Sequence, residues 1–233
     1  MVNNWLNIIQ ECILPPTCIL CGDSGFNSQD ICEACYSDIQ KNISCCYRCA
    51  EVFETTNIAP QLCGHCLSKT PHFNETYAPF IHQGIVRHLI AALKFQKHYK
   101  NARLLANLLS THLDKTAETP ELIIPMPLHK QRYKERGFNQ SFEIAKTVSK
   151  QLKVPIDSRS CIRQRNTPHQ TNLSAKQRHK NMNNAFQVIK SIDAQHVAIL
   201  DDVMTTGSSA NELAKALKKS GIARVDVWVC ARA

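Results

Sequence analysis

The sequence predicts an α/β fold, in which a mostly parallel sheet carries helices on both faces, preceded by a small cysteine-rich unit. Three observations support this prediction. Residues 1–75 hold 10 of the 12 cysteines. They carry 3 bases against 8 acids, whereas residues 76–233 carry 25 bases against 11 acids. In this second part, short apolar runs that suit buried strands alternate with apolar stripes at helical spacing. We therefore expect two domains, residues 1–70 and 71–233, that meet near Pro71.

The composition of the chain is that of a folded protein. Its 233 residues are 43% hydrophobic and 20% charged, which allows a packed core and excludes a disordered chain. The sequence contains no run of 18 apolar residues, so no transmembrane helix is expected, and the N-terminus lacks the basic region of a secretory signal. We expect the reducing cytoplasm as the compartment, without membrane insertion. The apolar positions between Trp5 and Ile13 are expected to pack against the folded body or a partner.

Strands and helices are expected to alternate in the second domain. Strands are expected where apolar or β-branched residues run together, at 76–82, 121–125, 196–200 and 224–229. Helices are expected where apolar side chains recur at spacings of three and four, in the stripes 85–93, 104–109, 138–152 and 213–217. Gly221 is a stop signal for the last helix. The cysteine-rich unit has too few apolar residues for a core of its own.

Four Cys-x-x-Cys pairs stand in series in the first domain. This spacing lets two thiolates from one turn reach one metal ion, and two such turns complete a tetrahedral site. We therefore predict structural Zn²⁺, one ion or two, which would supply folding energy that this unit lacks. The predicted ligands are Cys18, Cys21, Cys32, Cys35, Cys46, Cys49, Cys63 and Cys66. Neighbouring or alternate pairs could share an ion, and Cys45 or His65 could replace one of the paired cysteines.

The stretch 197–209 joins a buried strand to a turn rich in small and hydroxyl residues. The strand delivers two adjacent acids, Asp201 and Asp202, to the edge where ligands of open α/β sheets bind. Gly207 lets the backbone approach an anion closely, and the hydroxyls with the following N–H groups can enclose a phosphate at a helix N-terminus. A Rossmann dinucleotide site is excluded, because no Gly-x-Gly-x-x-Gly occurs.

Residues 129–180 are strongly basic, with 13 bases against 3 acids. Arg132 and Arg136 stand between a strand and a helix, where they can give bidentate contacts to a pyrophosphate. Lys94, at the end of a helical stripe, is a further candidate for this contact. Base stacking is not expected in this region, since aromatic residues are sparse. A less periodic stretch suits a mobile loop that closes over a substrate or contacts DNA, with the candidates Arg163, Arg165, Gln170 and Arg178.

The strand and turn at 197–209 resemble the signature of the type I phosphoribosyltransferase family, which has an apolar strand, two acids and Thr-Thr-Gly. The resemblance implies that this segment binds 5-phosphoribosyl-1-pyrophosphate (PRPP). Asp201 and Asp202 would be the catalytic residues, holding the ribose hydroxyls and, indirectly, Mg²⁺. The following turn would cradle the 5-phosphate. The implied PRPP-binding residues are Asp201, Asp202, Val203, Met204, Thr205, Thr206, Gly207, Ser208, Ser209, Lys94, Arg132 and Arg136.

Further motifs, from roughly Cys18 to Arg232, resemble the competence protein ComF family, related to the GntX proteins. Among them are Leu93–Phe95, Pro125–His129 and Arg136–Gln140, followed by the acidic strand and its turn. The resemblance implies a cytoplasmic bacterial protein of natural transformation, which acts in the uptake or processing of incoming single-stranded DNA. The implied partners are PRPP, single-stranded DNA, and the helicase-like and DNA-processing proteins of that pathway.

Three functions are compatible with these features. The chain can be an active phosphoribosyltransferase, for example one of nucleobase or nucleotide salvage. It can be a PRPP-binding module without catalysis that couples ligand binding to DNA handling. It can also be an adaptor whose cysteine-rich unit docks a partner, although the intact acids at 201 and 202 argue against this. The cysteine-rich unit is the only insertion placed to cover an acceptor, and the sequence favours PRPP and DNA binding.

Overall fold

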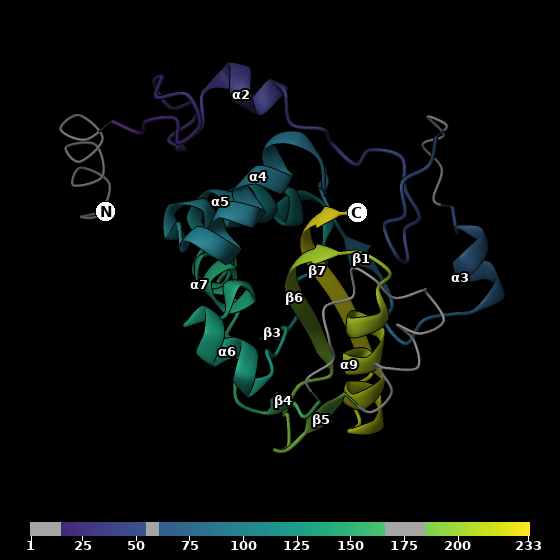
Figure 1. The fold of residues 1–233 in the computed structure, drawn as a ribbon. Helices are drawn as coiled ribbons and strands as arrows, with labels where there is room; N and C mark the ends of the chain where they lie inside the picture. Colours follow the sequence, from purple (N-terminus) through teal and green to yellow (C-terminus); the bar gives the residue numbers. More distant parts are fainter. Residues whose placement is uncertain (1–14, 55–60, 166–184) are drawn as a thin grey trace, which may run out of the picture.

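The computed structural model describes residues 15–54, 61–165 and 185–233 (Figure 1). The described part of the cysteine-rich unit contains two short helices, α2 (Glu33–Ser37) and α3 (Gly64–Ser68). The strands of the main sheet are β1 (Thr76–Tyr77), β2 (Phe80–Ile81), β3 (Leu122–Pro125), β6 (His196–Met204) and β7 (Arg224–Arg232), and a separate pair is formed by β4 (Cys161–Arg163) and β5 (Phe186–Val188). The helices of the second domain are α4 (Gly84–Gln96), α5 (Tyr99–Thr116), α6 (Lys130–Arg136), α7 (Gln140–Leu152) and α9 (Ser208–Lys219).

The main sheet is parallel throughout, as the sequence predicts. Its strand order is β1-β7-β6-β3, and β2 also pairs with β7. In the register of the sheet, Leu200 of β6 lies opposite Pro125 of β3 on one side and Trp228 of β7 on the other. α9 makes the crossover from β6 to β7. The antiparallel pair β4-β5 lies outside this sheet and was not predicted.

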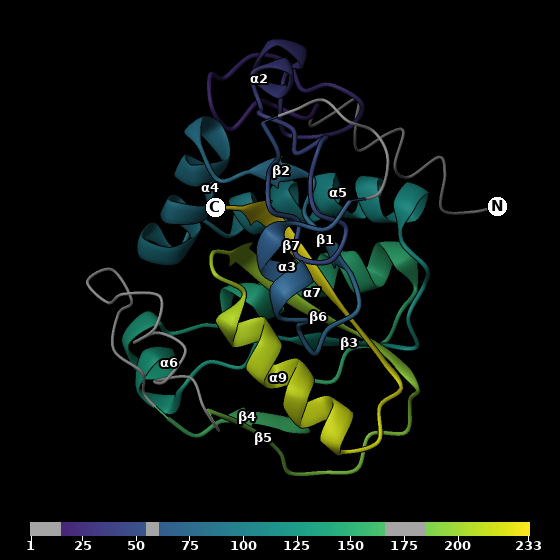
Figure 2. The same cartoon turned by 90° about the vertical axis from the view of Figure 1, so that its right-hand side faces the viewer.

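Helices cover both faces of the sheet. α4, α5 and α7 lie on one face and α9 on the other (Figures 1 and 2). Side chains along β6 alternate between two cores: Ala198 and Leu200 pack with the first group of helices, and Val197 and Ile199 pack on the side of α9. Because successive side chains of a strand point to opposite faces, a strand covered on both sides is apolar throughout. The predicted fold class is therefore confirmed.

Three strands differ in extent from the prediction. The strand expected at 224–229 is β7, which continues to Arg232. The run 76–82 predicts one strand, but the structure has the two short strands β1 and β2, because Pro79 has no N–H to donate to the ladder. The run 196–200 predicts a strand that ends before the acids, whereas β6 continues to Met204. The two adjacent acids therefore lie within a strand, and the pairing of β6 with β7 on either side of them holds their backbone.

The third predicted helix begins later than its apolar stripe suggests. Phe138 is buried, but it lies in the turn before α7, which begins at Gln140. Gly137 ends α6 in the left-handed region, with a φ of 83°. The Asn139 side chain then caps α7 by accepting a hydrogen bond from the N–H of Ser141 (3.0 Å). A glycine stop and an asparagine cap thus divide one basic stretch into two helices.

The cysteine-rich unit packs against the second domain. Ile31 and Ile39 are 1% and 3% exposed and belong to the core beneath α4 and α5. A hydrogen bond joins them as well, because the hydroxyl of Thr76 donates to the backbone carbonyl of Arg48 (2.7 Å). A unit too small for its own core therefore shares the core of its neighbour.

Three predicted features lie outside the described residues: the apolar segment Trp5–Ile13, Gln170 and Arg178. Arg165, the last described residue before position 185, is exposed. Within the described ranges, no helix has both the length and the apolar character needed to cross a membrane.

Candidate functional site

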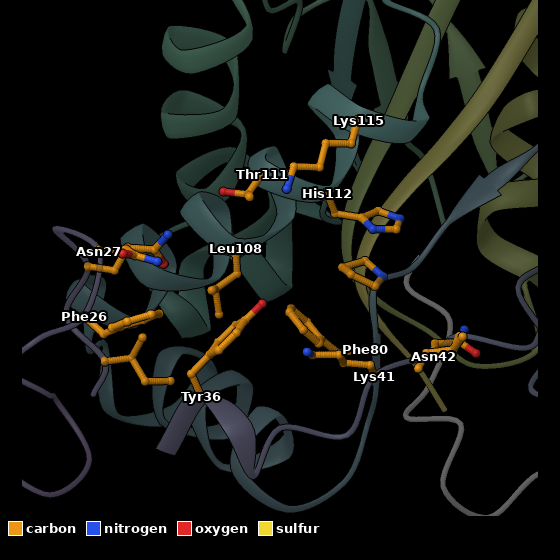
Figure 3. Close-up of a pocket in the computed structure, with 14 residues that line it drawn as sticks. Phe26, Asn27, Tyr36, Lys41, Asn42, Phe80, Leu108, Thr111, His112 and Lys115 are labelled. Atoms are coloured by element: carbon orange, nitrogen blue, oxygen red, sulfur yellow. The ribbon is translucent and has the colours of Figure 1, made fainter. Parts of the chain in front are cut away.

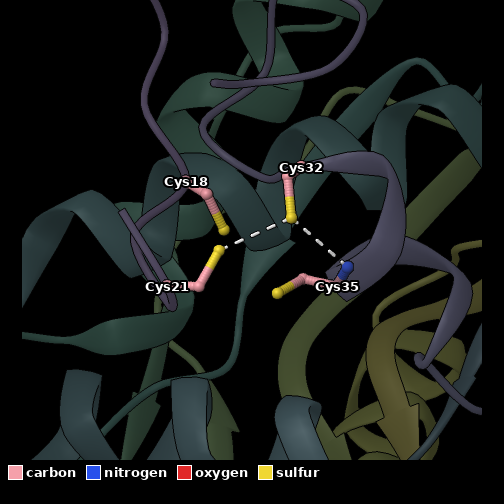
Figure 4. A group of neighbouring side chains, drawn as sticks. All are labelled: Cys18, Cys21, Cys32 and Cys35. Carbon is pink, nitrogen blue, oxygen red and sulfur yellow. Dashed lines mark hydrogen bonds between the residues drawn. The ribbon is translucent and has the colours of Figure 1, made fainter. Parts of the chain in front are cut away.

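The paired cysteines form two groups of four. In each group the sulfur atoms all lie within 4.8 Å of one another: Cys18, Cys21, Cys32 and Cys35 in the first group (Figure 4), and Cys46, Cys49, Cys63 and Cys66 in the second. A tetrahedral zinc ion with Zn–S bonds of about 2.3 Å holds its sulfurs about 3.8 Å apart. The Cys21–Cys32 and Cys49–Cys63 sulfur distances are 3.6 and 3.5 Å. Both groups therefore fit one zinc ion each.

The grouping decides which pairs share an ion. Consecutive pairs come together, and alternate pairs do not. Among the described residues, neither Cys45 nor His65 joins a group. The first cysteine of each group is favoured as a thiolate: burial alone would raise the pKa of Cys18, but hydrogen bonds from the backbone at Cys32 and in its own turn lower it to about 6. The pKa of Cys46 is lowered in the same way, and zinc binds the deprotonated form.

The two predicted catalytic carboxylates lie side by side near the end of β6 with different partners. Asp202 is 2% exposed and forms an ion pair with Lys94 of α4. It also accepts a hydrogen bond from Nε2 of Gln140 (3.3 Å). Asp201 is partly exposed, and its Oδ1 accepts hydrogen bonds from the Ser141 hydroxyl (2.7 Å) and from the N–H of Asp202 (2.9 Å). The start of α7 therefore orients both carboxylates.

These surroundings separate the pKa values of the pair. Burial, reinforced by the charge of Asp202, raises the pKa of Asp201 to about 7. Burial acts on Asp202 in the same direction, but the ammonium group of Lys94 outweighs it and holds the pKa of Asp202 below its usual value. Asp202 is therefore ionised at neutral pH, while Asp201 exchanges its proton there. A carboxyl group that titrates near neutrality is common at functional sites.

Basic side chains predicted from the sequence surround this pair. Burial lowers the pKa of Arg136, and the charge of Asp202 opposes that effect, which places the guanidinium near the carboxylates. Arg163 of β4 also responds to burial first and then to the charges of Arg132 and Asp201. The structure thus brings together the predicted cations Lys94, Arg132, Arg136 and Arg163, which are distant in the sequence.

The turn after β6 forms a small concavity at the start of α9. Gly207 caps this 12-residue helix with a φ of 71°, in the left-handed region. The hydroxyl groups of Thr206 and Ser208 share a hydrogen bond (2.9 Å) where α9 begins. The concavity has a volume of about 50 Å³, and its lining includes Asp201, Val203, Met204, Thr205, Thr206, Gly207, Ser208 and Ser209. Backbone N–H groups and hydroxyls in this arrangement suit a phosphate.

A larger cavity, of about 740 Å³, lies between the turn and the second cysteine group. Residues 205–208 line one side, and His65 of α3 lines another. Arg232, 6% exposed, joins the two sides. It donates to the carbonyl oxygens of Cys49 (3.1 Å) and Met204 (3.3 Å). The second cysteine group is therefore fixed to the strand end that carries the turn, and the cavity has the size of a ligand site.

A third cavity, of about 540 Å³, lies between the first cysteine group and α5. Figure 3 shows Phe26 and Tyr36 of the cysteine-rich unit together with Leu108 and Thr111 of α5. None of the residues that line it belongs to β6 or to the turn that follows. This cavity is therefore separate from the site around Asp201.

Two residues of the site were not among the predicted ones. Gln140 bonds to Asp202 and accepts a hydrogen bond from Arg136 (2.5 Å), and Ser141 bonds to Asp201. The sequence feature that could have indicated Gln140 and Ser141 is the helix cap at Asn139, which fixes the direction of the first side chains of α7. Which carboxylates they reach depends on the packing of α7 against β6.

Comparison with known proteins agrees with this architecture. Residues 9–75 match the family model of the double zinc ribbon domain. Competence protein F of Haemophilus influenzae is 33% identical over 225 residues, which cover 93% of this chain and 96% of that protein. The chain belongs to the competence protein F family. A second relative of this chain, DNA utilization protein YhgH of Escherichia coli strain K12, is 32% identical over 225 residues, covering 94% of this chain and 98% of that protein.

Two solved structures align with part of this member of the competence protein F family. The allosteric regulatory enzyme of purine biosynthesis aligns over 56% of this chain and 26% of its own, at 14% identity and a TM-score of 0.37. Adenine phosphoribosyltransferase from Leishmania tarentolae aligns over 58% of each chain, at 14% identity and a TM-score of 0.35. Both likenesses are partial and concern the fold alone.

Proposed function

We propose that this chain binds PRPP with Mg²⁺ at the end of β6 and acts in the cytoplasm on single-stranded DNA during natural transformation, in its uptake or processing. The observation that carries the proposal is the meeting of two carboxylates, several cations and a hydroxyl-rich turn at one strand end. PRPP has the complementary groups, namely a ribose diol, a pyrophosphate and a 5-phosphate.

Each part of the site suits one part of PRPP. Asp201 and Asp202 accept hydrogen bonds from the ribose hydroxyls. Residues 205–209 hold the 5-phosphate with backbone N–H groups and hydroxyls. Arg132 and Arg136 contact the pyrophosphate, because guanidinium groups bind phosphate oxygens in pairs. The chemistry that Mg²⁺ supplies is neutralisation of the pyrophosphate charge, and carboxylates are among the oxygen ligands that it prefers.

The DNA part of the proposal is supported by the relatives and by the charge. The relatives carry the names competence protein F and DNA utilization protein. Residues 76–233 hold 25 bases against 11 acids, an excess that attracts a phosphate backbone. Proteins that unwind or process the incoming strand are the partners that this role requires.

A second candidate function is phosphoribosyl transfer to a nucleobase or another acceptor. It is favoured by the 740 Å³ cavity, which adjoins the turn for the 5-phosphate and has room for an acceptor beside the second cysteine group. In this reaction the bond from the ribose C1 to pyrophosphate breaks, the bond to the acceptor forms, and the acceptor loses a proton. The basic side chains stabilise the charge that grows on the departing pyrophosphate.

Calorimetric titration of the zinc-loaded full chain with Mg²⁺ and PRPP tests the main proposal. We expect Asp202→Asn to weaken PRPP binding by about tenfold or more, because it removes a charged hydrogen-bond acceptor. Asp114→Asn, an exposed acid on α5, is the matched control and should leave the affinity unchanged. Equal affinities in all three proteins would contradict the proposed PRPP site. Release of pyrophosphate with any acceptor, DNA included, would establish transfer, and its absence with every acceptor would exclude the second candidate.

A further inference from the structure

A groove of about 790 Å³ lies along α6, where this helix meets the start of α7 and β4. Its lining includes Lys130, Tyr133 and Lys134 of α6, together with Phe142 of α7 and Arg163 of β4. No residue of β6 or of the turn that follows it, residues 205–209, lines this groove. The groove is therefore distinct from the proposed PRPP site, although the two are neighbours.

α6 presents different side chains to these two places. Arg132 and Arg136 are four residues apart, and Arg136 responds to the charges of both adjacent acids. Lys130, Tyr133 and Lys134, at spacings of three and four, line the groove instead. Residues three and four apart share one face of a helix. A ligand in the groove would thus lie about one helix diameter, about 10 Å, from the PRPP site.

The groove combines positive charge with an exposed aromatic ring. Tyr133 is 52% exposed, and Lys130 and Lys134 on the same face are exposed as well. Glu143 is the one acid among the described residues that line the groove, and it is already in an ion pair with Lys146. An exposed ring beside exposed lysines suits a ligand that has both a flat π system and negative charge.

We propose that this groove binds a segment of single-stranded nucleic acid, with a base stacked on Tyr133 and backbone phosphates at Lys130 and Lys134. The inference rests on the proposed role in DNA handling and names the surface that serves it. A single strand is favoured over a duplex, because only unpaired bases expose their faces for stacking. An acidic peptide matches the charge of the groove, but it offers no flat ring at each charged unit.

This proposal departs from the expectation drawn from the sequence. Aromatic residues are sparse between 129 and 180, which argues against base stacking. The fold changes this, because it places Tyr133 and Phe142 on two helices around one groove and adds Arg163 from a strand. The number of aromatic residues along this stretch of the chain is thus a poor guide to how many lie together on this surface.

Fluorescence anisotropy with a labelled oligothymidylate of about 15 nucleotides tests the proposal on the zinc-loaded full chain. Tyr133→Ala should weaken binding by about tenfold, whereas Tyr133→Phe, which keeps the ring, should bind like the wild type. The double substitution Lys130→Ala/Lys134→Ala should lower the slope of log affinity against log salt by about 1.4, because each phosphate contact contributes about 0.7. The matched control is Lys100→Ala/Lys150→Ala, which removes two exposed lysines outside the groove. Apart from a small long-range electrostatic effect, this control should leave the slope unchanged. PRPP affinity should stay unchanged in every variant.

The possible results separate this inference from the proposed function. If the oligonucleotide binds the groove variants and the wild type equally, DNA binds elsewhere and the groove proposal is wrong while the DNA role stands. If the wild type binds no oligonucleotide at any salt concentration, with or without PRPP, the DNA role itself is wrong. If polyglutamate displaces the oligonucleotide as well as unlabelled DNA does, and Tyr133→Ala has no effect, the groove is a general anion surface and stacking is refuted.

Discussion

Asp201→Asn is expected to stabilise the folded chain at pH 8, although it removes a predicted catalytic carboxylate. Burial raises the pKa of Asp201 from 3.8 to about 7. Between these two values the folded protein keeps a proton that the unfolded chain has released, so stability falls as the pH rises through this range. Asparagine does not ionise, and its Oδ1 can still accept the hydrogen bonds from Ser141 and from the N–H of Asp202.

The size of the effect follows from the pKa difference. About 3 pH units at about 1.4 kcal/mol each correspond to about 4 kcal/mol. Asp201 is partly exposed, and solvent screens part of this cost, so we expect a gain of about 2 kcal/mol. In a chain of this length such a gain raises the Tm by about 4–8 °C. The gain should be near zero at about pH 4 and complete at pH 8, since it grows only between the two pKa values.

Asp202→Asn provides a control with the opposite sign. Burial would raise the pKa of Asp202, but the nearby Lys94 holds it low, so this carboxylate is charged at pH 8. The substitution leaves Lys94, whose side chain is 20% exposed, without its partner. We expect a loss of about 3 kcal/mol. The stabilisation by Asp202 is present above the pKa of the unfolded chain and disappears as the pH falls through the lower pKa of the folded state.

Scanning calorimetry of the three zinc-loaded proteins between about pH 4 and pH 8 measures both effects. Asp201→Asn should raise the Tm at the upper end of this range, and Asp202→Asn should lower it. The reasoning is refuted if both substitutions move the Tm in the same direction, or if the effect of Asp201→Asn is the same at both ends. A gain in stability together with a loss of PRPP binding in Asp201→Asn would show that Asp201 costs stability for the sake of the site.

Two further substitutions test the turn and the link to the second cysteine group. Gly207→Ala should cost about 1 kcal/mol, because a Cβ at a φ of 71° is strained while its nearest neighbour, Met204 Sδ, is at an ordinary 3.5 Å. It should also weaken PRPP binding in calorimetry. Gly221→Ala, at a φ of 102° just after α9, should cost stability without changing that affinity. Arg232→Met should cost about 3 kcal/mol in urea unfolding at fixed zinc concentration, because it strips two carbonyl oxygens and Glu51 of a buried partner. Glu51→Gln should cost clearly less, since the side chain of Glu51 is half-exposed, and equal losses in these two variants would contradict this account.

Much of the fold could be predicted because its signals are local. β6 is apolar on both faces, since helices cover both sides of the sheet, and this shows in the run from Val197 to Leu200. The break between β1 and β2 could also have been predicted, because Pro79 cannot donate a hydrogen bond to a neighbouring strand. The β-prone residues on both sides of Pro79 instead suggested one continuous strand. The pair β4-β5 was missed, because a strand of three residues leaves too short a pattern.

For the chemistry of the site, too, local features could be predicted from the sequence and contacts between distant segments could not. The sequence by itself determined which residue types are available: eight cysteines at the spacing of metal turns, and two acids followed by a glycine and hydroxyls, because ligand spacing and turn geometry are local properties. The tertiary structure alone decided that consecutive cysteine pairs share an ion, that Lys94 pairs with Asp202 rather than Asp201, and that one face of α6 opens onto a groove. These outcomes depend on distances and burial between segments far apart in the chain. Such distances set charge states and contacts, and no local pattern encodes them.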